Sequence, residues 1–174
     1  MMKALTTIKA PLEALFDVAV NFEVRVQWDK NVADFKIYHQ TADESEMRLS
    51  YRFLSPASLI ASDRDFYVMQ LIRRDYPQKG DVSIYTKSLP DHPECPVTKA
   101  VRAKIFITSF ILRPKVDEAG KEVTEFFMVT QVDVGGWIPH TIVNNFSSSV
   151  PRETFQKLEA AANDYVQKKA QPKL

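Results

Sequence analysis

The side chains most often used in catalysis are few in this chain and far apart in its sequence. The three histidines, His39, His92 and His140, stand in different segments, so they predict neither a metal site nor a catalytic triad. Cys95 lies in a proline-rich loop with no predicted base beside it, so we expect it to be unreactive. The chain also lacks a glycine-rich phosphate-binding loop. The sequence therefore points away from metal, nucleophilic and nucleotide chemistry, and we expect no cofactor.

The composition is that of an ordinary globular domain. The chain has 174 residues, of which 45% are hydrophobic and 26% charged, enough for a continuous core. Lys and Arg total 23 and Asp and Glu total 22, so no net charge attracts nucleic acid or an anionic membrane. A single cysteine permits no internal disulfide, and no run reaches the roughly 18 apolar residues of a membrane span. We predict one domain over 1–174, located in the cytoplasm because a secretory segment is lacking.

The spacing of the apolar residues predicts a protein made mainly of antiparallel strands. Alternation of polar and apolar residues indicates about seven strands, and most connections between them read as short turns. Helical spacing follows Pro11 and, less clearly, extends over 23–30. The expected strands are 3–9, 32–40, 47–53, 65–74, 81–88, 97–113 and 122–134.

The C-terminal part predicts a long amphipathic helix. The strand over 122–134 leads through two glycines to Pro139, which suits the first turn of a helix. Pro151 should interrupt the helix near 147–151, because it lacks an amide donor. A sheet covered by one such helix can leave a hollow between the two, and we place the function there. The apolar stripe consists of Ile138, Ile142, Phe146, Val150, Phe155, Leu158, Ala162 and Tyr165.

Apolar residues near the mouth of this hollow suggest a lid. Leu59 and Ile60 lie in the predicted loop 55–62 without an obvious partner. Exposed apolar residues beside a cavity favour contact with a bilayer surface and opening there, although the same residues could simply pack together and close the core. On the helix, the lid would be completed by Ile138, Ile142, Val143 and Phe146.

Five segments carry a resemblance to a known family. They are RVQWD at 25–29, DRDF at 63–66, HPECP at 92–96, VR at 101–102 and DVGGWIP at 133–139. In order and rough spacing they resemble the START family of lipid-transfer domains along nearly the whole chain. The resemblance implies an α+β helix-grip fold, in which a curved antiparallel sheet wraps around a long C-terminal helix and one lipid occupies a tunnel between them.

The resemblance also implies a shortened N-terminus. Family domains usually have a further helix and two strands before the segment that corresponds to 3–9, and these are lacking here. We therefore expect the first strand at or near an edge of the sheet, where its backbone groups are exposed. The sequence does not predict the oligomeric state.

In relatives that carry phosphatidylcholine, an arginine three residues before a Trp-Asp pair contacts the lipid phosphate, and aromatic side chains from three strands surround the choline. By position the arginine is Arg25. The aromatic residues are Phe66, Phe106 and either Tyr51 or Phe53, which share one face of a strand. A guanidinium binds phosphate oxygens in pairs, and ring faces attract a quaternary ammonium. Alternatively, Arg25 only anchors its helix and the rings only fill the core.

In sterol-carrying relatives, an acidic residue and an arginine lie deep in the cavity. The arginine position corresponds to Gln70 and the acidic position falls near 51–52, so the charged pair is missing here. The resemblance thus favours a phospholipid-like ligand over a sterol, although Gln70 could still bind a hydroxyl. Arg102 could serve either the ligand or the structure. Arg64 and Asp65 are expected to form a buried structural pair at the start of their strand.

We therefore expect a non-catalytic, intracellular carrier or sensor of one lipid, with transient contact to a membrane surface and no nucleic-acid partner. Two alternatives remain open. A cyclase or aromatase of the helix-grip superfamily would need a cluster of titratable groups facing the cavity. A protein-interaction module would have a small or collapsed cavity.

Overall fold

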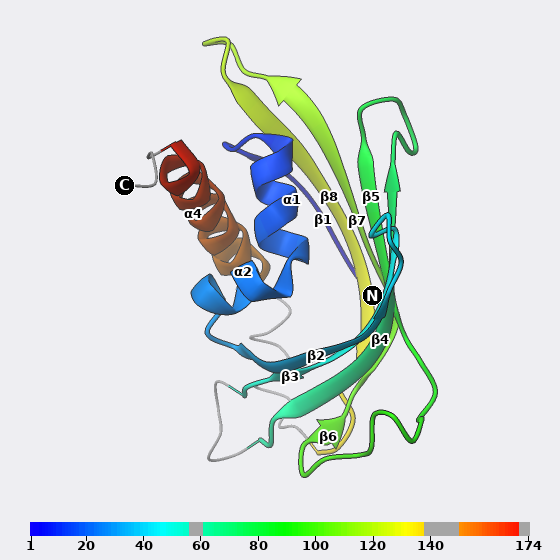
Figure 1. Cartoon of the computed structure of the whole chain (residues 1–174). Coiled ribbons are helices and arrows are strands. Elements are labelled where there is room, and N and C mark those ends of the chain that lie inside the picture. Colours follow the sequence, from blue (N-terminus) through cyan, green and yellow to red (C-terminus); the bar gives the residue numbers. More distant parts are fainter. Residues whose placement is uncertain (56–60, 138–149, 171–174) are drawn as a thin grey trace.

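A curved sheet with helices on its concave side makes up the part of the chain that the computed structural model describes, residues 1–55, 61–137 and 150–170 (Figure 1). The strands are β1 (Met2–Ile8), β2 (Val32–Gln40), β3 (Glu46–Phe53), β4 (Arg64–Arg74), β5 (Val82–Ser88), β6 (Val101–Arg102), β7 (Lys104–Val116) and β8 (Glu122–Asp133). The helices are α1 (Leu12–Val20), α2 (Phe22–Trp28) and α4 (Val150–Ala170).

The eight strands form one sheet in the order β1-β8-β7-β5-β4-β3-β2, with β6 beside β4. All pairs are antiparallel except β4 with β6. β1 lies at one edge, next to β8, as the sequence predicts. The α+β helix-grip class is confirmed, since the sheet curves around α1 and α4 (Figure 1).

The prediction of a single strand over 97–113 is wrong in its bounds. Val101 and Arg102 pair in parallel with β4, whereas the chain from Lys104 onward pairs with β8. Between these two pairings lies Ala103, which is 1% exposed and points into the core. At this point the chain stops pairing with β4 and begins to pair with β8, so the predicted strand is divided into β6 and β7. β7 continues to Val116.

Apolar side chains on the concave face gather in two clusters. The prediction that alternate residues of 47–53 face one way is confirmed, because Met47 and Leu49 belong to one cluster and Tyr51 and Phe53 pack against it. The α4 cluster includes Ile8, Leu15, Ile72, Ile84, Leu112, Phe126, Met128, Leu158 and Ala162. The α2 cluster consists of Phe22, Val32, Met47, Leu49, Phe66, Val68, Ala103 and Ile105.

α4 packs on α1 and on the strands at the β1 edge of the sheet (Figure 1). Leu158 and Ala162 are buried, and the ring of Phe155 meets that of Phe126 edge-on, with centroids 5.4 Å apart. Glu159 accepts a hydrogen bond from the Lys9 amide at 2.8 Å. The predicted apolar stripe is thus confirmed for its second half. Its first half, residues 138–149, lies outside the described residues.

Asp81 and Arg113 join β5 to β7 at the end of the sheet away from β6. The carboxylate of Asp81 is 2% exposed and accepts from Nε and Nη2 of Arg113 at 3.0 and 2.8 Å. These charge-assisted bonds hold the pKa of Asp81 below its usual range. The pair therefore stabilises the fold where the pH lies above the ordinary pKa of an aspartate.

Asp81→Asn should lower the free energy of unfolding at pH 7 by about 1–3 kcal/mol, because Arg113 loses the closer of its two charged partners. The lowered pKa makes the wild-type contribution complete above about pH 4 and removes it as the pH falls through the folded-state value. Urea unfolding at pH 7 and pH 3 should show the difference between the two proteins shrinking at pH 3. Asp164→Asn, which breaks an exposed pair with Lys168, should change stability by less than about 1 kcal/mol at either pH. An equal loss at both pH values would contradict this assignment.

Candidate functional site

An aromatic group lies where α2 meets the sheet. Tyr51 on β3 stands opposite Phe66 on β4, and their rings stack with centroids 4.9 Å apart. Phe22, the first residue of α2, approaches Tyr51 at 5.3 Å, and Phe35 of β2 lies 5.8 Å from Phe22. Phe53 follows Tyr51 on the same face of β3. The two rings that the sequence predicts on β3 and β4 are therefore in contact.

Arg25 lies on α2 beside this aromatic group. Its guanidinium is 5.6 Å from the centroid of the Phe22 ring. Nε and Nη2 each lie 3.3 Å from the same carboxylate oxygen of Asp29, one helical turn further on. Burial raises the pKa of Tyr51, and the nearby charge of Arg25 opposes that rise. A guanidinium held at the rim of an aromatic wall is suited to a ligand that carries both an anionic and an apolar part.

Phe106, which the resemblance places beside the rings of Tyr51 and Phe66, does not contact them. It is 44% exposed, and its ring lies 5.6 Å from Nζ of Lys104. Its neighbour Ile105 points into the α2 cluster, and the register of β7 against β8 shifts between Ile105 and Ile107. Phe22 and Phe35, which no pattern in the sequence indicates as site residues, stand near Tyr51 instead. Asn21 could have indicated that α2 begins at Phe22, because its side chain accepts from two amides.

Gln70 lies on the concave face between the two clusters. Val68 and Ile72, its neighbours on the same face of β4, belong to the α2 and the α4 cluster respectively. The side chain of Gln70 is 6% exposed, and its amide makes no hydrogen bond to any residue that the structure describes. Among the described residues, Nε of Arg52 is the buried side-chain atom that lacks a partner, so the amide of Gln70 keeps contact with the space beside the concave face.

Arg102 is paired with carboxylates. Its Nε and Nη2 donate to the two oxygens of Asp65 at 2.9 and 3.2 Å, and Nη1 donates to Asp91 at 3.0 Å. The bonds to Asp65 raise the pKa of Arg102 further. Thr98 completes the partners of Asp65 with a bond of 3.0 Å. This geometry favours the structural role that the sequence left open for Arg102.

Arg64 and Asp65 are both buried, but the expectation that they pair with each other is wrong. Asp65 faces Arg102, whereas Arg64 donates to the carbonyls of Ser62, Val134 and Gly135. Adjacent residues of a strand point to opposite faces, so the two side chains cannot meet. Arg64 instead fixes the chain that leaves β8.

Glycines allow this chain to pass close to β6. Gly135 and Gly136 have φ angles of 57° and 64°, in the left-handed region. A Cβ at Gly135 would lie 3.2 Å from a methyl group of Val101 and 3.4 Å from the carbonyl of Arg102. The predicted junction after β8 is therefore a close contact between backbone segments. The candidate lid residues Leu59, Ile60, Ile142 and Phe146 lie outside the described residues, so the lid stays a prediction.

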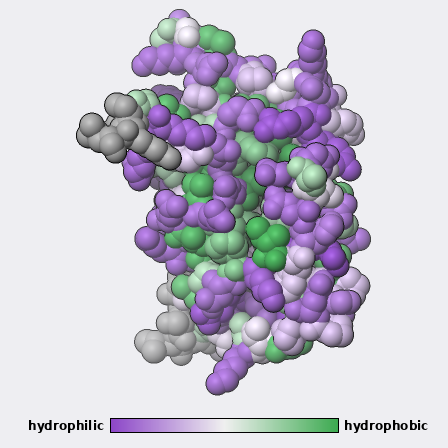
Figure 2. Space-filling view, viewed as in Figure 1, coloured by the Kyte–Doolittle hydropathy of each residue, from purple (hydrophilic) through white to green (hydrophobic). Residues whose placement is uncertain are grey.

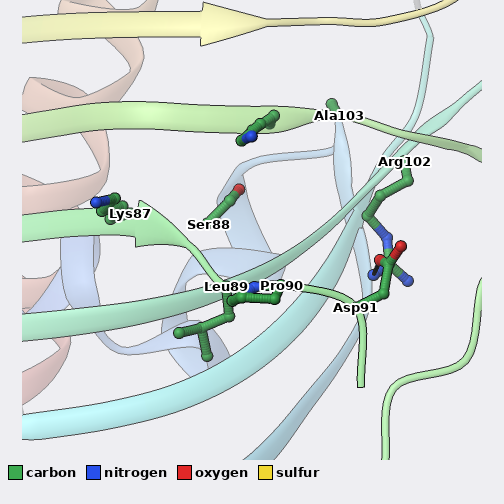
Figure 3. Close-up of a pocket in the computed structure, with 8 residues that line it drawn as sticks. Lys87, Ser88, Leu89, Pro90, Asp91, Arg102 and Ala103 are labelled. Carbon is green, nitrogen blue, oxygen red and sulfur yellow. Dashed lines mark hydrogen bonds and ion pairs between the residues drawn. The ribbon is translucent and has the colours of Figure 1, made fainter. Parts of the chain in front are cut away.

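A hollow of about 470 Å³ opens where β5 and β7 separate (Figure 3). The last paired residues are Thr86 and Thr108, and beyond them the amide of Ile105 donates to Oγ of Ser88 at 2.9 Å. The guanidinium of Arg102 at the wall of the hollow is already engaged by carboxylates. The lining consists of Lys87, Ser88, Leu89, Pro90, Asp91, Arg102, Ala103 and Lys104.

Figure 2 shows apolar surface in the middle of the face seen in Figure 1, with polar side chains around it.

Within residues 1–55, 61–137 and 150–170, no group of His, Cys, Asp and Glu side chains could hold a metal ion. Among the helices that the structure describes, none is long and apolar enough to cross a membrane.

A family model described as "START domain" matches residues 1–168, so the chain belongs to the START domain family. The resemblance seen in the sequence is thereby confirmed. The mitochondrial steroidogenic acute regulatory protein of Danio rerio is 27% identical over 150 residues, which cover 85% of this chain and 50% of that protein. StAR-related lipid transfer protein 5 of Bos taurus is 28% identical over 145 residues, covering 82% of this chain and 64% of that protein.

The chain spans about half the length of the first of these relatives. Among solved structures, human STARD10 aligns with a TM-score of 0.78 and 23% identity, over 96% of this chain and 64% of that one. Human StAR-related lipid transfer protein 5 aligns with a TM-score of 0.75 and 23% identity, over 97% of this chain and 76% of that one. These likenesses show a shared fold. Family membership supports lipid binding and transfer as the general activity of the domain.

Arg102→Gln should lower the free energy of unfolding by about 1–3 kcal/mol, because the carboxylate of Asp65 is 8% exposed and would lose its charged partner. A double-mutant cycle with Asp65→Asn, measured by urea unfolding, should give a coupling energy above about 1 kcal/mol. Arg73→Gln, which changes an exposed arginine, should leave stability within about 0.5 kcal/mol of the wild type. If the effects of Arg102→Gln and Asp65→Asn merely add, the pair does not hold β6, and Arg102 is free for the ligand role that the resemblance implies.

Proposed function

We propose that this domain binds a single lipid between the concave face of the sheet and the helices that cover it, and carries that lipid between membranes without changing it chemically. The observation that carries the proposal is the buried Gln70, whose amide has no partner among the described residues and stands between two apolar clusters. Each CH₂ of the lipid that moves from water into an apolar interior stabilises the complex by about 0.8 kcal/mol. A polar group in the middle of that interior fixes the position of the lipid. The carrier would act in the cytoplasm through transient contact with a membrane surface.

A phospholipid-like cargo is favoured over a sterol. Arg25 stands beside the stacked rings of Tyr51 and Phe66, and its pair with Asp29 uses Nε and Nη2. The Nη1 donors are left for a phosphate oxygen, and the ring faces suit a quaternary ammonium at about 1–2 kcal/mol. Gln70 occupies the position where the resemblance places an arginine for sterols. Arg52 pairs with Asp34 and Asp63, so it does not supply the missing charge.

The enzymatic alternative receives less support from the concave face. Between the two clusters, the described strands offer Gln70 and the threonines Thr86, Thr108 and Thr130, none of which titrates near neutral pH. General acid or base catalysis would need a group that does.

The carrier proposal predicts uptake of one phosphatidylcholine per chain from liposomes, seen as a mass shift in native mass spectrometry. Arg25→Gln should weaken this binding about tenfold or more, since a hydrogen bond to a charged group contributes about 1.5–3 kcal/mol. Arg48→Gln is the matched control, because Arg48 pairs with Glu94 on the convex side of the sheet.

Failure to take up either phosphatidylcholine or cholesterol would overturn the carrier proposal. Uptake of cholesterol alone would overturn the preference for phospholipid. Equal binding by wild type and the Arg25 variant would remove Arg25 from the headgroup site.

A further inference from the structure

A row of hydrogen-bonding side chains crosses the concave face at the level of Gln70. Gln70 on β4 stands directly opposite Thr86 on β5, Thr86 opposite Thr108 on β7, and Thr108 opposite Thr130 on β8. Residues directly opposite in a sheet point to the same face, so these four side chains form one line. We call Gln70, Thr86, Thr108 and Thr130 the polar row.

The polar row borders the α4 cluster along its whole length. Two residues away on each strand, on the same face and toward the same side of the row, lie Ile72, Ile84, Phe110 and Met128, all of which belong to that cluster or pack against it. On the other side of the row, Val68 belongs to the α2 cluster. Thr86 and Thr108 also form the last rung before β5 and β7 separate. The row therefore borders the α4 cluster on one side, and on β4 it separates that cluster from the α2 cluster.

Part of the hydrogen-bonding capacity of the row is unused. The hydroxyls of Thr108 and Thr130 bond to each other at 2.7 Å. Neither the Gln70 amide nor the Thr86 hydroxyl bonds to any side chain or backbone group in the described part of the chain. The Gln70 amide supplies two donors, and Thr86 and the Thr108–Thr130 pair each have one O–H to give. With no charged side chain in the row, the matching ligand group is uncharged, and the free N–H and O–H groups suit an acceptor such as a carbonyl oxygen.

We propose that the polar row binds the acyl ester carbonyls of a diacyl glycerophospholipid, with Gln70 and Thr86 as the donors. This inference rests on the proposed function and names the part of the lipid that the sheet recognises. Phe66, in the aromatic group beside Arg25, is four residues from Gln70 on β4, about 13 Å at 3.3 Å per residue. This is comparable with the extended distance from a choline nitrogen to an acyl carbonyl. The headgroup would lie at Arg25 and the acyl chains along the α4 cluster.

The test compares two phosphatidylcholines with the same headgroup and chain length, one with ester-linked and one with ether-linked chains. The ether lipid keeps the charge and the apolar area but has no carbonyl acceptor. In competition from mixed liposomes, read by native mass spectrometry, the wild type should take the ester lipid about tenfold in preference. Gln70→Leu and Thr86→Val keep the volume of the side chains and should each lower this preference, and the double variant should take both lipids nearly equally.

Thr7→Val is the matched control, because Thr7 is exposed on β1 and should keep the wild-type preference. Thermal unfolding of each variant identifies any loss of folded protein, and the nearly isosteric Thr86→Val keeps the test valid if Gln70→Leu does not fold. Equal uptake of both lipids by the wild type would overturn the ester assignment and leave the carrier proposal standing. Uptake of neither lipid would overturn both.

Discussion

The apolar contact between α4 and α1 fixes where α4 lies on the sheet, and the arrangement of the concave face depends on that position. Leu158 and Ala162 of α4 are buried in the same cluster as Leu15 of α1. Glu159 and Asn163 bond to the backbone of Lys9, and Lys169 pairs with Asp17. α4 is thus held by α1 and by the β1 edge of the sheet. The polar row crosses the concave surface formed by β4, β5, β7 and β8.

Buried charged side chains and uncharged hydrogen-bonding side chains occupy different parts of the sheet. The buried ions lie at the ends of strands, where Asp65 meets Arg102, Asp81 meets Arg113, and Arg64 meets backbone carbonyls. Each is compensated within the fold, as a buried charge must be. The middle of the concave face carries uncharged groups, and two of them lack partners in the described part of the chain. This division separates the residues that hold the sheet from those that we propose face the lipid.

The sequence predicted the features that depend on local pattern. The inward face of 47–53 and the stripe over 155–165 follow from spacing alone, whereas the edge position of β1 was implied by the family resemblance. The division of 97–113 into β6 and β7 did not, because it depends on pairing with β4 and β8. The shift of register after Ile105 exposes Phe106 and could not be seen in a single sequence. The polar row was missed for the same reason, since its members are aligned only by the register of four strands.

The most direct test of the account places a photoreactive diazirine at the end of one acyl chain of phosphatidylcholine. After uptake and illumination, peptide mass spectrometry locates the crosslinked residues. If the acyl chains lie on the concave face, the labels will fall on residues of the α4 cluster such as Ile84, Leu112 and Met128. Labels confined to the convex face, at residues such as Leu5 or Tyr85, would contradict this placement of the chains.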